Sequence, residues 1–142
     1  DAGLLARATV WAATNEEGAN QAFNITNGDL FRWNELWPRI ARMFELDVAP
    51  PLSMSLDVVM ADKEPLWNQM VKRHGLAENP YSAVSSWRFG DAVFSWDYDM
   101  FGDGSKARRF GFHEFVETEA MFERLFAEYR ARKIIPPLST RP

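Results

Sequence analysis

Hydrophobic and polar positions in this chain repeat mainly with helical spacing. Apolar side chains recur every three or four residues over 4–14, 31–46 and 118–132, which predicts three amphipathic helices. Pro65 suits the first position of a further helix, and Gly75 suits its end. Shorter helices are predicted over 55–60 with Ser55 as the cap, after Asn79-Pro80, within 85–96 with an interruption near Gly90, and over 105–110. Pro38 predicts a kink or a late start in the second helix.

Two short segments fit strands better than helices. Residues 21–26 form one candidate, which the Asn27-Gly28 turn ends. Residues 47–51 form the other, although their two prolines exclude the middle of a fully paired strand. Because two strands alone do not make a stable sheet, the partners of the first should lie outside this chain. The pattern thus predicts a mostly α chain with two short strands.

Composition narrows the function classes. The 142 residues are 46% apolar and 25% charged, which is ordinary for a soluble globular protein. Aromatic residues make up 14%, which indicates an aromatic core, an aromatic-lined pocket or a face buried by a partner. The net charge of −4 disfavours nucleic-acid binding, and no apolar run approaches the roughly 20 residues that span a bilayer. With no cysteine and no visible signal peptide, a cytoplasmic protein is predicted.

Several short motifs suggest chemistry but have simpler interpretations. The glycine pattern of 102–107, GDGSKA, is better explained as a turn capped by Ser105 than as a dinucleotide loop, since the helix after it is short. Tyr129 and Lys133 match a Tyr-x-x-x-Lys pair, yet a core tyrosine and a cation in the last helical turn explain both. The acidic segment from Asp97 lacks the oxygen ligands of a calcium loop. His74 and His113 stand alone. No catalytic residue and no metal site is therefore predicted in this chain.

Three segments together resemble a known family. They are AFNITNGDLFRWNELWPRIARMF (22–44), KEPLWNQMVKRHGL (63–76) and SSWRFGDAVFSW (85–96), and residues 105–136 are similar to the family's last segment. The group is the progesterone 5β-reductase/iridoid synthase-like branch of the extended short-chain dehydrogenase/reductases, and the resemblance is to its C-terminal part. The chain opens without Met, from which we also expect it to be a piece of a longer protein.

The resemblance implies an α/β parent fold, with a Rossmann domain followed by a helical substrate domain. Residues 1–52 would be the last helix-strand-helix elements of the Rossmann domain. Residues 53–136 would form the substrate-binding domain, and residues 137–142 a loose tail. Asn27-Gly28 would then be the turn at the carboxyl end of a sheet strand, where open α/β sheets bind ligands.

The resemblance also implies a chemistry. Such enzymes transfer hydride from NADPH, or NADH, to an enone or enal, while a Tyr and a Lys stabilise the enolate oxygen. Those residues and the glycine-rich cofactor loop belong to the N-terminal part of the family. No catalytic and no cofactor-binding residue is therefore expected here, and the chain alone should be inactive.

The substrate side of the family does map onto this chain. Its Trp-Trp-Phe-Gly-Asp stretch reads Trp87-Arg88-Phe89-Gly90-Asp91 here. The matching Phe89, with Trp87, is predicted to line a pocket for a hydrophobic small molecule. Arg88 departs from the second Trp, which puts a steroid-like substrate in doubt. Plain core packing is the alternative for Phe89.

Two other functions stay open. A sugar-nucleotide epimerase or dehydratase relative is one, although the pocket segment is aromatic rather than polar. A stand-alone helical module that binds a protein through its aromatic face is the other. The main interpretation predicts the N-terminal Rossmann half as partner, no nucleic acid or membrane, and self-association through an exposed apolar face.

Overall fold

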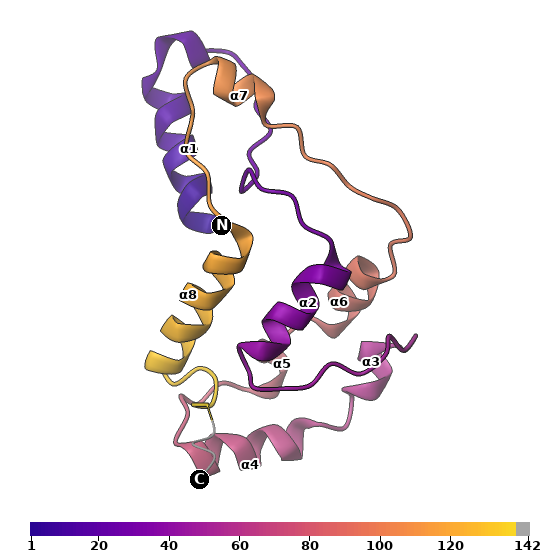
Figure 1. The fold of residues 1–142 in the computed structure, drawn as a ribbon. Helices are drawn as coiled ribbons and strands as arrows, with labels where there is room; N and C mark the ends of the chain where they lie inside the picture. Colours follow the sequence, from indigo (N-terminus) through magenta and orange to yellow (C-terminus); the bar gives the residue numbers. More distant parts are fainter. Residues whose placement is uncertain (139–142) are drawn as a thin grey trace. The chain divides into compact units, whose positions relative to one another are not determined.

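The computed structural model describes residues 1–138, and helices make up almost all of its regular structure (Figure 1). The helices are α1 (Ala2–Thr14), the 3-10 helix η1 (Glu16–Gly18), α2 (Trp33–Arg42), α3 (Leu56–Val59), α4 (Glu64–His74), α5 (Tyr81–Val84), α6 (Trp87–Phe94), α7 (Ser105–Arg109) and α8 (Thr118–Ala131). The predicted mostly helical character is confirmed. Residues 139–142 of the predicted loose tail lie outside the described residues.

The two predicted strands are absent as paired elements. Residues 21–27 and 46–54 form neither helix nor strand, and the described residues contain only an isolated parallel bridge, between Gly28 and Val116. The bridge includes a hydrogen bond of 2.8 Å from the Val116 amide to the Asn27 carbonyl. The difference has a simple cause, because an isolated segment has no ladder to join without neighbouring strands.

The chain divides into two compact units. Unit 1 contains Asp1–Met43 and Asp99–Arg124, and unit 2 contains Phe44–Tyr98 and Leu125–Pro142. Each unit is thus built from two separate parts of the sequence. The functional division at residues 52 and 53 concerns roles within a larger protein and stays a prediction.

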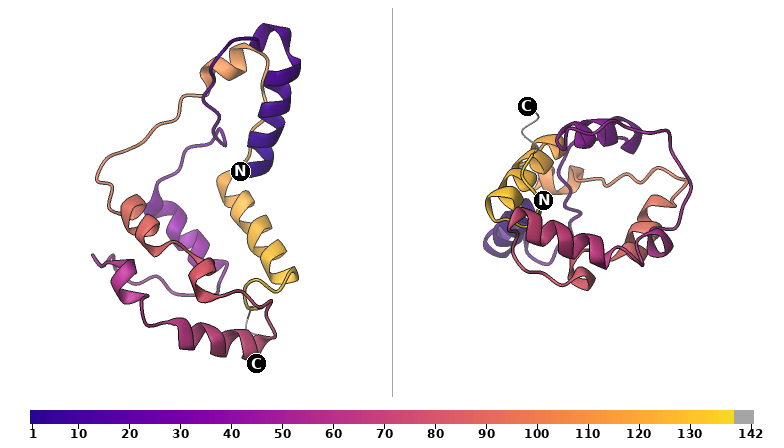
Figure 2. Two further views of the ribbon diagram at one scale, coloured as in Figure 1. Left: turned by 180° about the vertical axis from the view of Figure 1, so that it is seen from behind. Right: turned by 90° about the horizontal axis from the view of Figure 1, so that it is seen from below.

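Unit 1 has an aromatic core between α1 and α7, which lie side by side in Figures 1 and 2. Its buried members are Leu4, Ala8, Ala107 and Phe112, with Trp11, Phe23, Ile25 and Val116 packed around them. The Trp11 ring lies 5.0 Å from Phe23 and 5.3 Å from Phe112 between centroids. Burial of such large rings is the main source of stability in a small core.

The turn at Asn27-Gly28 ties this unit together. Gly28 has φ +97°, and an added Cβ would lie 3.0 Å from Cβ of Phe115. The Asn27 amide donates to the hydroxyl of Thr118 at 3.0 Å. The carboxylate of Asp29 accepts from the Thr118 amide at 2.6 Å and from its hydroxyl at 2.7 Å. The turn therefore places two polar side chains on the buried Thr118, the first residue of α8.

The second helix differs from its prediction. Arg32 is its N-cap and it begins at Trp33, so Pro38 lies inside α2 and a late start is not observed. A proline in the helix interior lacks the N–H that would otherwise donate to the preceding turn. The helix thus tolerates one missing backbone hydrogen bond.

Unit 2 has far less buried apolar surface. Leu76 is its only buried residue within the described part of the chain. It follows Gly75, which ends α4 in the left-handed conformation at φ +57°, as predicted. The predicted helix after Asn79-Pro80 is α5, with Pro80 at the N-cap position, and the Asn79 side-chain amide donates to the Ala77 carbonyl at 3.4 Å.

Candidate substrate-binding site

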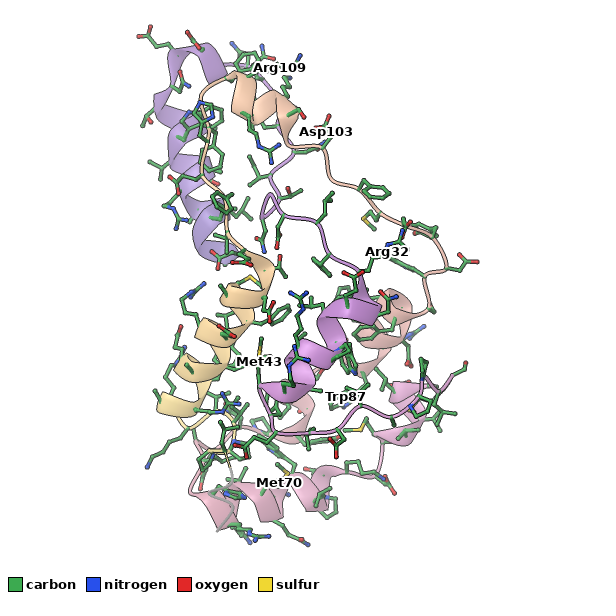
Figure 3. The ribbon with its side chains drawn as sticks, viewed as in Figure 1. Arg32, Met43, Met70, Trp87, Asp103 and Arg109 are labelled. Atoms are coloured by element: carbon green, nitrogen blue, oxygen red, sulfur yellow. The ribbon has the colours of Figure 1, made fainter. Side chains whose placement is uncertain are left out.

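Both predicted pocket residues lie on α6 in unit 2. Figure 3 labels Trp87. Trp87 is the first residue of the helix and is partly buried. Phe89 has 69% of its surface exposed, so it is not a core residue of this unit. Arg88 between them is exposed as well. The helix therefore presents an aromatic ring that no neighbour within the unit covers, which suits contact with an apolar ligand.

The predicted interruption of this helix at Gly90 is wrong. The helix runs unbroken from Trp87 to Phe94, and Gly90 lies in its middle. A Cβ at this position would approach Cδ1 of Leu56 to 3.0 Å. Glycine is thus used for close packing of α6 against α3 rather than for a turn. Figure 2 shows α3 and α6 side by side.

Asp91 fixes the start of α3. One carboxylate oxygen accepts the Leu56 amide at 2.6 Å, and the other accepts the Asp57 amide at 3.1 Å and the Ser55 hydroxyl at 2.9 Å. The two backbone amides, with the hydroxyl, hold the pKa of Asp91 below its usual value, against a smaller opposing effect of burial. An ionised carboxylate is the best acceptor for the unpaired amides at a helix N-terminus. Ser55 is also the N-cap itself, as predicted, and accepts from the Val58 amide at 3.4 Å.

Tyr81 fixes the other end of α3. Its hydroxyl donates to the carbonyl of Met60, the C-cap residue of α3, at 2.6 Å. Its ring lies 6.1 Å from the ring of Trp87 between centroids. Trp87 is the first residue of α6, and Tyr81 is the first residue of α5. Tyr81 therefore connects α5 to both α3 and α6, while Asp91 connects α6 to the start of α3. We call Tyr81, Trp87 and Asp91 the α3 clamp.

Sequence patterns did not identify Asp91 and Tyr81 as contributors to this site. Their partners lie 35 and 21 residues earlier in the chain, and no local spacing encodes such a contact. A Gly-Asp pair inside an amphipathic helix was the one available signal. It could have indicated close helix packing followed by a polar contact.

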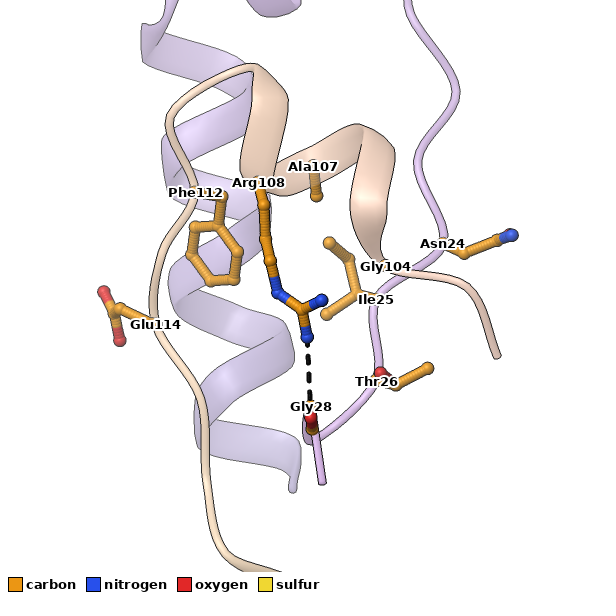
Figure 4. A pocket seen from close by; sticks show the side chains of 9 residues that line it. All are labelled: Asn24, Ile25, Thr26, Gly28, Gly104, Ala107, Arg108, Phe112 and Glu114. Atoms are coloured by element: carbon orange, nitrogen blue, oxygen red, sulfur yellow. Dashed lines mark hydrogen bonds between the residues drawn. The ribbon is translucent and has the colours of Figure 1, made fainter. Parts of the chain in front are cut away.

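The hollows of unit 1 offer a weaker alternative. The one in Figure 4 has a cavity volume of about 10 Å³, which holds about one water molecule. The Arg108 guanidinium there donates to the Gly28 carbonyl at 3.5 Å. A second, open hollow of about 330 Å³ borders the first turn of α1 and residues 25–27. The Asp1 carboxylate beside it already accepts from the Leu4 amide and from Arg124. Neither hollow presents convergent groups that suggest a reaction.

The GDGSKA segment behaves as the simpler interpretation predicted, with a different cap. It leads into α7, a helix of five residues. Asp103, rather than Ser105, satisfies the helix start by accepting the Ser105 amide at 2.8 Å. The Ser105 hydroxyl and then its amide lower the pKa of Asp103. No strand precedes this segment and no long helix follows it in the described part of the chain, so it does not fit a dinucleotide.

The Tyr129 and Lys133 pair is not assembled into a site. Tyr129 lies within α8, whereas Lys133 follows the end of the helix at φ +56° and not in its last turn. The Lys133 amide donates to the Arg130 carbonyl at 3.0 Å, which closes the helix end. Among residues 1–138, no three His, Asp or Glu side chains cluster as metal ligands. Within the same range, no helix has both the length and the apolarity needed to cross a membrane.

Comparison with known proteins agrees with the resemblance found in the sequence. No protein-family model matches the chain. It is 33% identical to an (S)-8-oxocitronellyl enol synthase of Camptotheca acuminata over 140 residues, covering 96% of this chain and 36% of that protein. It is 32% identical to an (S)-8-oxocitronellyl enol synthase of Nepeta racemosa over 143 residues, covering 99% of this chain and 36% of the relative. It is 32% identical to the 3-oxo-Delta(4,5)-steroid 5-beta-reductase of Arabidopsis thaliana over 139 residues, covering 96% and 36%.

The alignments with these relatives cover nearly the whole of this chain. The chain spans about a third of their length. A mostly helical portion of a larger α/β protein agrees with that coverage and with the observed fold. The chain therefore belongs to the progesterone 5β-reductase/iridoid synthase-like group of the extended short-chain dehydrogenase/reductases.

Proposed function

We propose that this chain is the substrate-binding part of an NAD(P)H-dependent oxidoreductase. The whole protein would reduce an activated C=C bond, as in an enone or enal, or a C=O bond of a hydrophobic small molecule. The observation that carries this proposal is the relation to enol synthases and a steroid 5-beta-reductase over 96% of the chain. The exposed Phe89 on α6 supports it, because an apolar substrate needs an apolar wall.

The work would be divided between two parts of the enzyme. The nicotinamide cofactor would supply the hydride, and the region outside this chain would hold the cofactor and the proton-donating residues. This chain's residues would bind and orient the substrate, with Phe89 against its apolar face and Trp87 holding the first turn of α6 through its contact with Tyr81. Positioning a substrate accelerates its reaction only when the reacting groups are present. Because the cofactor and the proton-donating residues would lie outside this chain, the chain by itself is expected to be inactive.

Exposed apolar residues of unit 2 favour this proposal over a stand-alone binding module. Large side chains such as Leu52, Val58 and Phe89 are more than two-thirds exposed. A module that works alone would expose few such residues, because exposed apolar surface promotes association. A substrate and the N-terminal Rossmann half are the partners that would cover them, and self-association would replace these partners in the isolated chain.

The test compares the isolated chain with the full-length protein. Each is mixed with NADPH and a 3-oxo-Δ4,5-steroid, and loss of NADPH absorbance is followed. We expect turnover by the full-length protein only, and no saturable NADPH binding by the chain. Tight NADPH binding to the chain alone would overturn the proposed division of roles. Failure of the full-length protein on the steroid and on an aliphatic enal alike would overturn the proposed reaction.

A further inference from the structure

We propose that Asp91 is a positioning residue for the substrate site, and that it acts by locking α6 onto α3 so that Phe89 is held in place. This inference rests on the proposed function, since it assigns Phe89 to the substrate. It extends that function because Asp91 itself need not touch the substrate. Four observations carry it.

The first is that both oxygens of one carboxylate are used. They accept three hydrogen bonds of 2.6 to 3.1 Å from Ser55, Leu56 and Asp57. Three donors on consecutive residues define the position and the orientation of the carboxylate relative to α3. A single contact would leave α6 free to rotate.

The second is that the α3 clamp contacts both ends of α3. Asp91 lies four residues after Trp87 on α6, so the two side chains are one helical turn apart on the same face. Trp87 contacts Tyr81, and Tyr81 binds the Met60 carbonyl at the opposite end of α3. Movement of α6 along α3 would therefore break contacts at both ends.

The third is that Phe89 lies between the two fixed points. It is two residues from Trp87 and two from Asp91. Residues two apart on a helix do not share a face, so Phe89 points away from the clamp. Its 69% exposure agrees with that direction.

The fourth is that unit 2 has little hydrophobic burial to hold these helices. Leu76 is the only buried residue among the described residues of the unit, and it does not belong to α3 or α6. Helices of four and eight residues are too short to be stable alone. The contacts of Asp91 therefore add to the packing of Gly90 against Leu56 in setting the geometry of α6.

The experiment uses Asp91→Ala, Asp91→Asn and Phe89→Ala in the full-length protein, with Asp62→Ala as the matched control. Asp62 is exposed in the same unit, and its partner among residues 1–138 is the neighbouring Lys63. Amide hydrogen exchange at Leu56 and Asp57 reports the clamp directly. Steady-state kinetics with NADPH report the site, using the 3-oxo-Δ4,5-steroid or the aliphatic enal, whichever the unchanged protein reduces faster.

We expect Asp91→Ala to speed exchange at both amides about tenfold or more, and to raise KM about tenfold with kcat changed less than about twofold. Asp91→Asn should lie between Ala and the unchanged protein, because its one carbonyl oxygen can still accept from Leu56. Asp62→Ala should change neither readout. An unchanged KM in Asp91→Ala, while Phe89→Ala raises KM, would overturn the positioning role.

The two proposals fail in different ways. If Phe89→Ala leaves KM unchanged, the assignment of Phe89 to the substrate is wrong, and the positioning role falls with it. Amide exchange would still show whether Asp91 holds α3. If Asp91→Ala lowers kcat and leaves KM unchanged, Asp91 acts on the chemical step and the positioning role is overturned.

Discussion

Unit 1 and unit 2 are each stabilised by a different kind of internal contact. Unit 1 has a core that includes the buried Leu4 and Phe112, against which the partly buried rings of Trp11 and Phe23 pack. Unit 2 has Leu76 as the one buried residue among its described residues, and side chains such as Asp91 join its short helices. A region with little core can thus be ordered by polar contacts between short helices. Its apolar side chains then stay available for a ligand or a partner.

The largest expected effect tests the core of unit 1. Leu4 is 1% exposed, and Leu4→Ala should lower the free energy of unfolding by about 3 kcal/mol, since it removes buried methyl groups and leaves a cavity. Chemical denaturation measures this loss. Val10→Ala, on the same helix at a 63% exposed position, should change stability by less than about 0.5 kcal/mol. Equal effects of the two variants would contradict the described core.

A smaller effect is expected at the buried polar contact of unit 1. Thr118→Val removes the hydroxyl that binds both Asn27 and Asp29, and should cost about 2 kcal/mol because polar partners lose a buried contact. Thr9→Val is the control, since the Thr9 hydroxyl makes an exposed hydrogen bond to the carbonyl of Leu5 in its own helix. Thermal unfolding compares them. A Thr118 variant as stable as the Thr9 variant would show that the turn does not tie the unit together.

The pH dependence of unit 2 should follow Asp91. Its pKa is lowered by the amides of Leu56 and Asp57, so the folded state favours the charged form more than the unfolded state does. The resulting stability is present above the unfolded pKa, near 3.9 for Asp. It is lost as pH falls through the lower folded pKa. Amide exchange at Leu56, measured from pH 6 to acid, should report this loss.

Asp91→Asn provides the control for that titration. Without an ionisable group at this position, the acid-induced rise in the opening of α3 should disappear after correction for intrinsic exchange. Retention of the same pH dependence in Asp91→Asn would assign it to another carboxylate and contradict the account.

The smallest stability effect is expected where the functional effect is largest. Phe89→Ala should change the free energy of unfolding by less than about 0.5 kcal/mol, because the ring is mostly exposed. Leu76→Ala, in the one buried position of the described unit 2, should cost about 2 kcal/mol or more. Thermal unfolding measures both variants. A large loss with Phe89→Ala would show that this ring packs in a core after all.

Sequence periodicity was sufficient for the long helices. The apolar repeats and the Gly75 end signal predicted α1, α4 and α8 to within a few residues. Local signals failed where distant contacts decide the structure. Gly90 suggested a break, but Leu56 packs against it and the helix continues.

The candidate site shows the same limit. The resemblance to the reductase family identified Trp87 and Phe89, and the structure places both on one helix. Asp91 was present in the same motif, yet its contacts with α3 depend on how the chain folds back over 35 residues. The pattern of residues 21–26 predicts a strand. A strand forms only when it pairs with a neighbouring strand, and the described residues contain no such strand.

The most direct test of the central claim is an equilibrium dissociation constant for the full-length protein in the presence of NADP⁺. The ligand is the 3-oxo-Δ4,5-steroid or the aliphatic enal, whichever the unchanged protein reduces faster. Phe89→Ala is compared with Leu66→Ala, which alters an exposed apolar residue of α4 in the same unit. Loss of an aromatic contact should weaken binding about tenfold in Phe89→Ala, with less than about a twofold change in Leu66→Ala. Equal affinities in the two variants would contradict the assignment of α6 to the substrate.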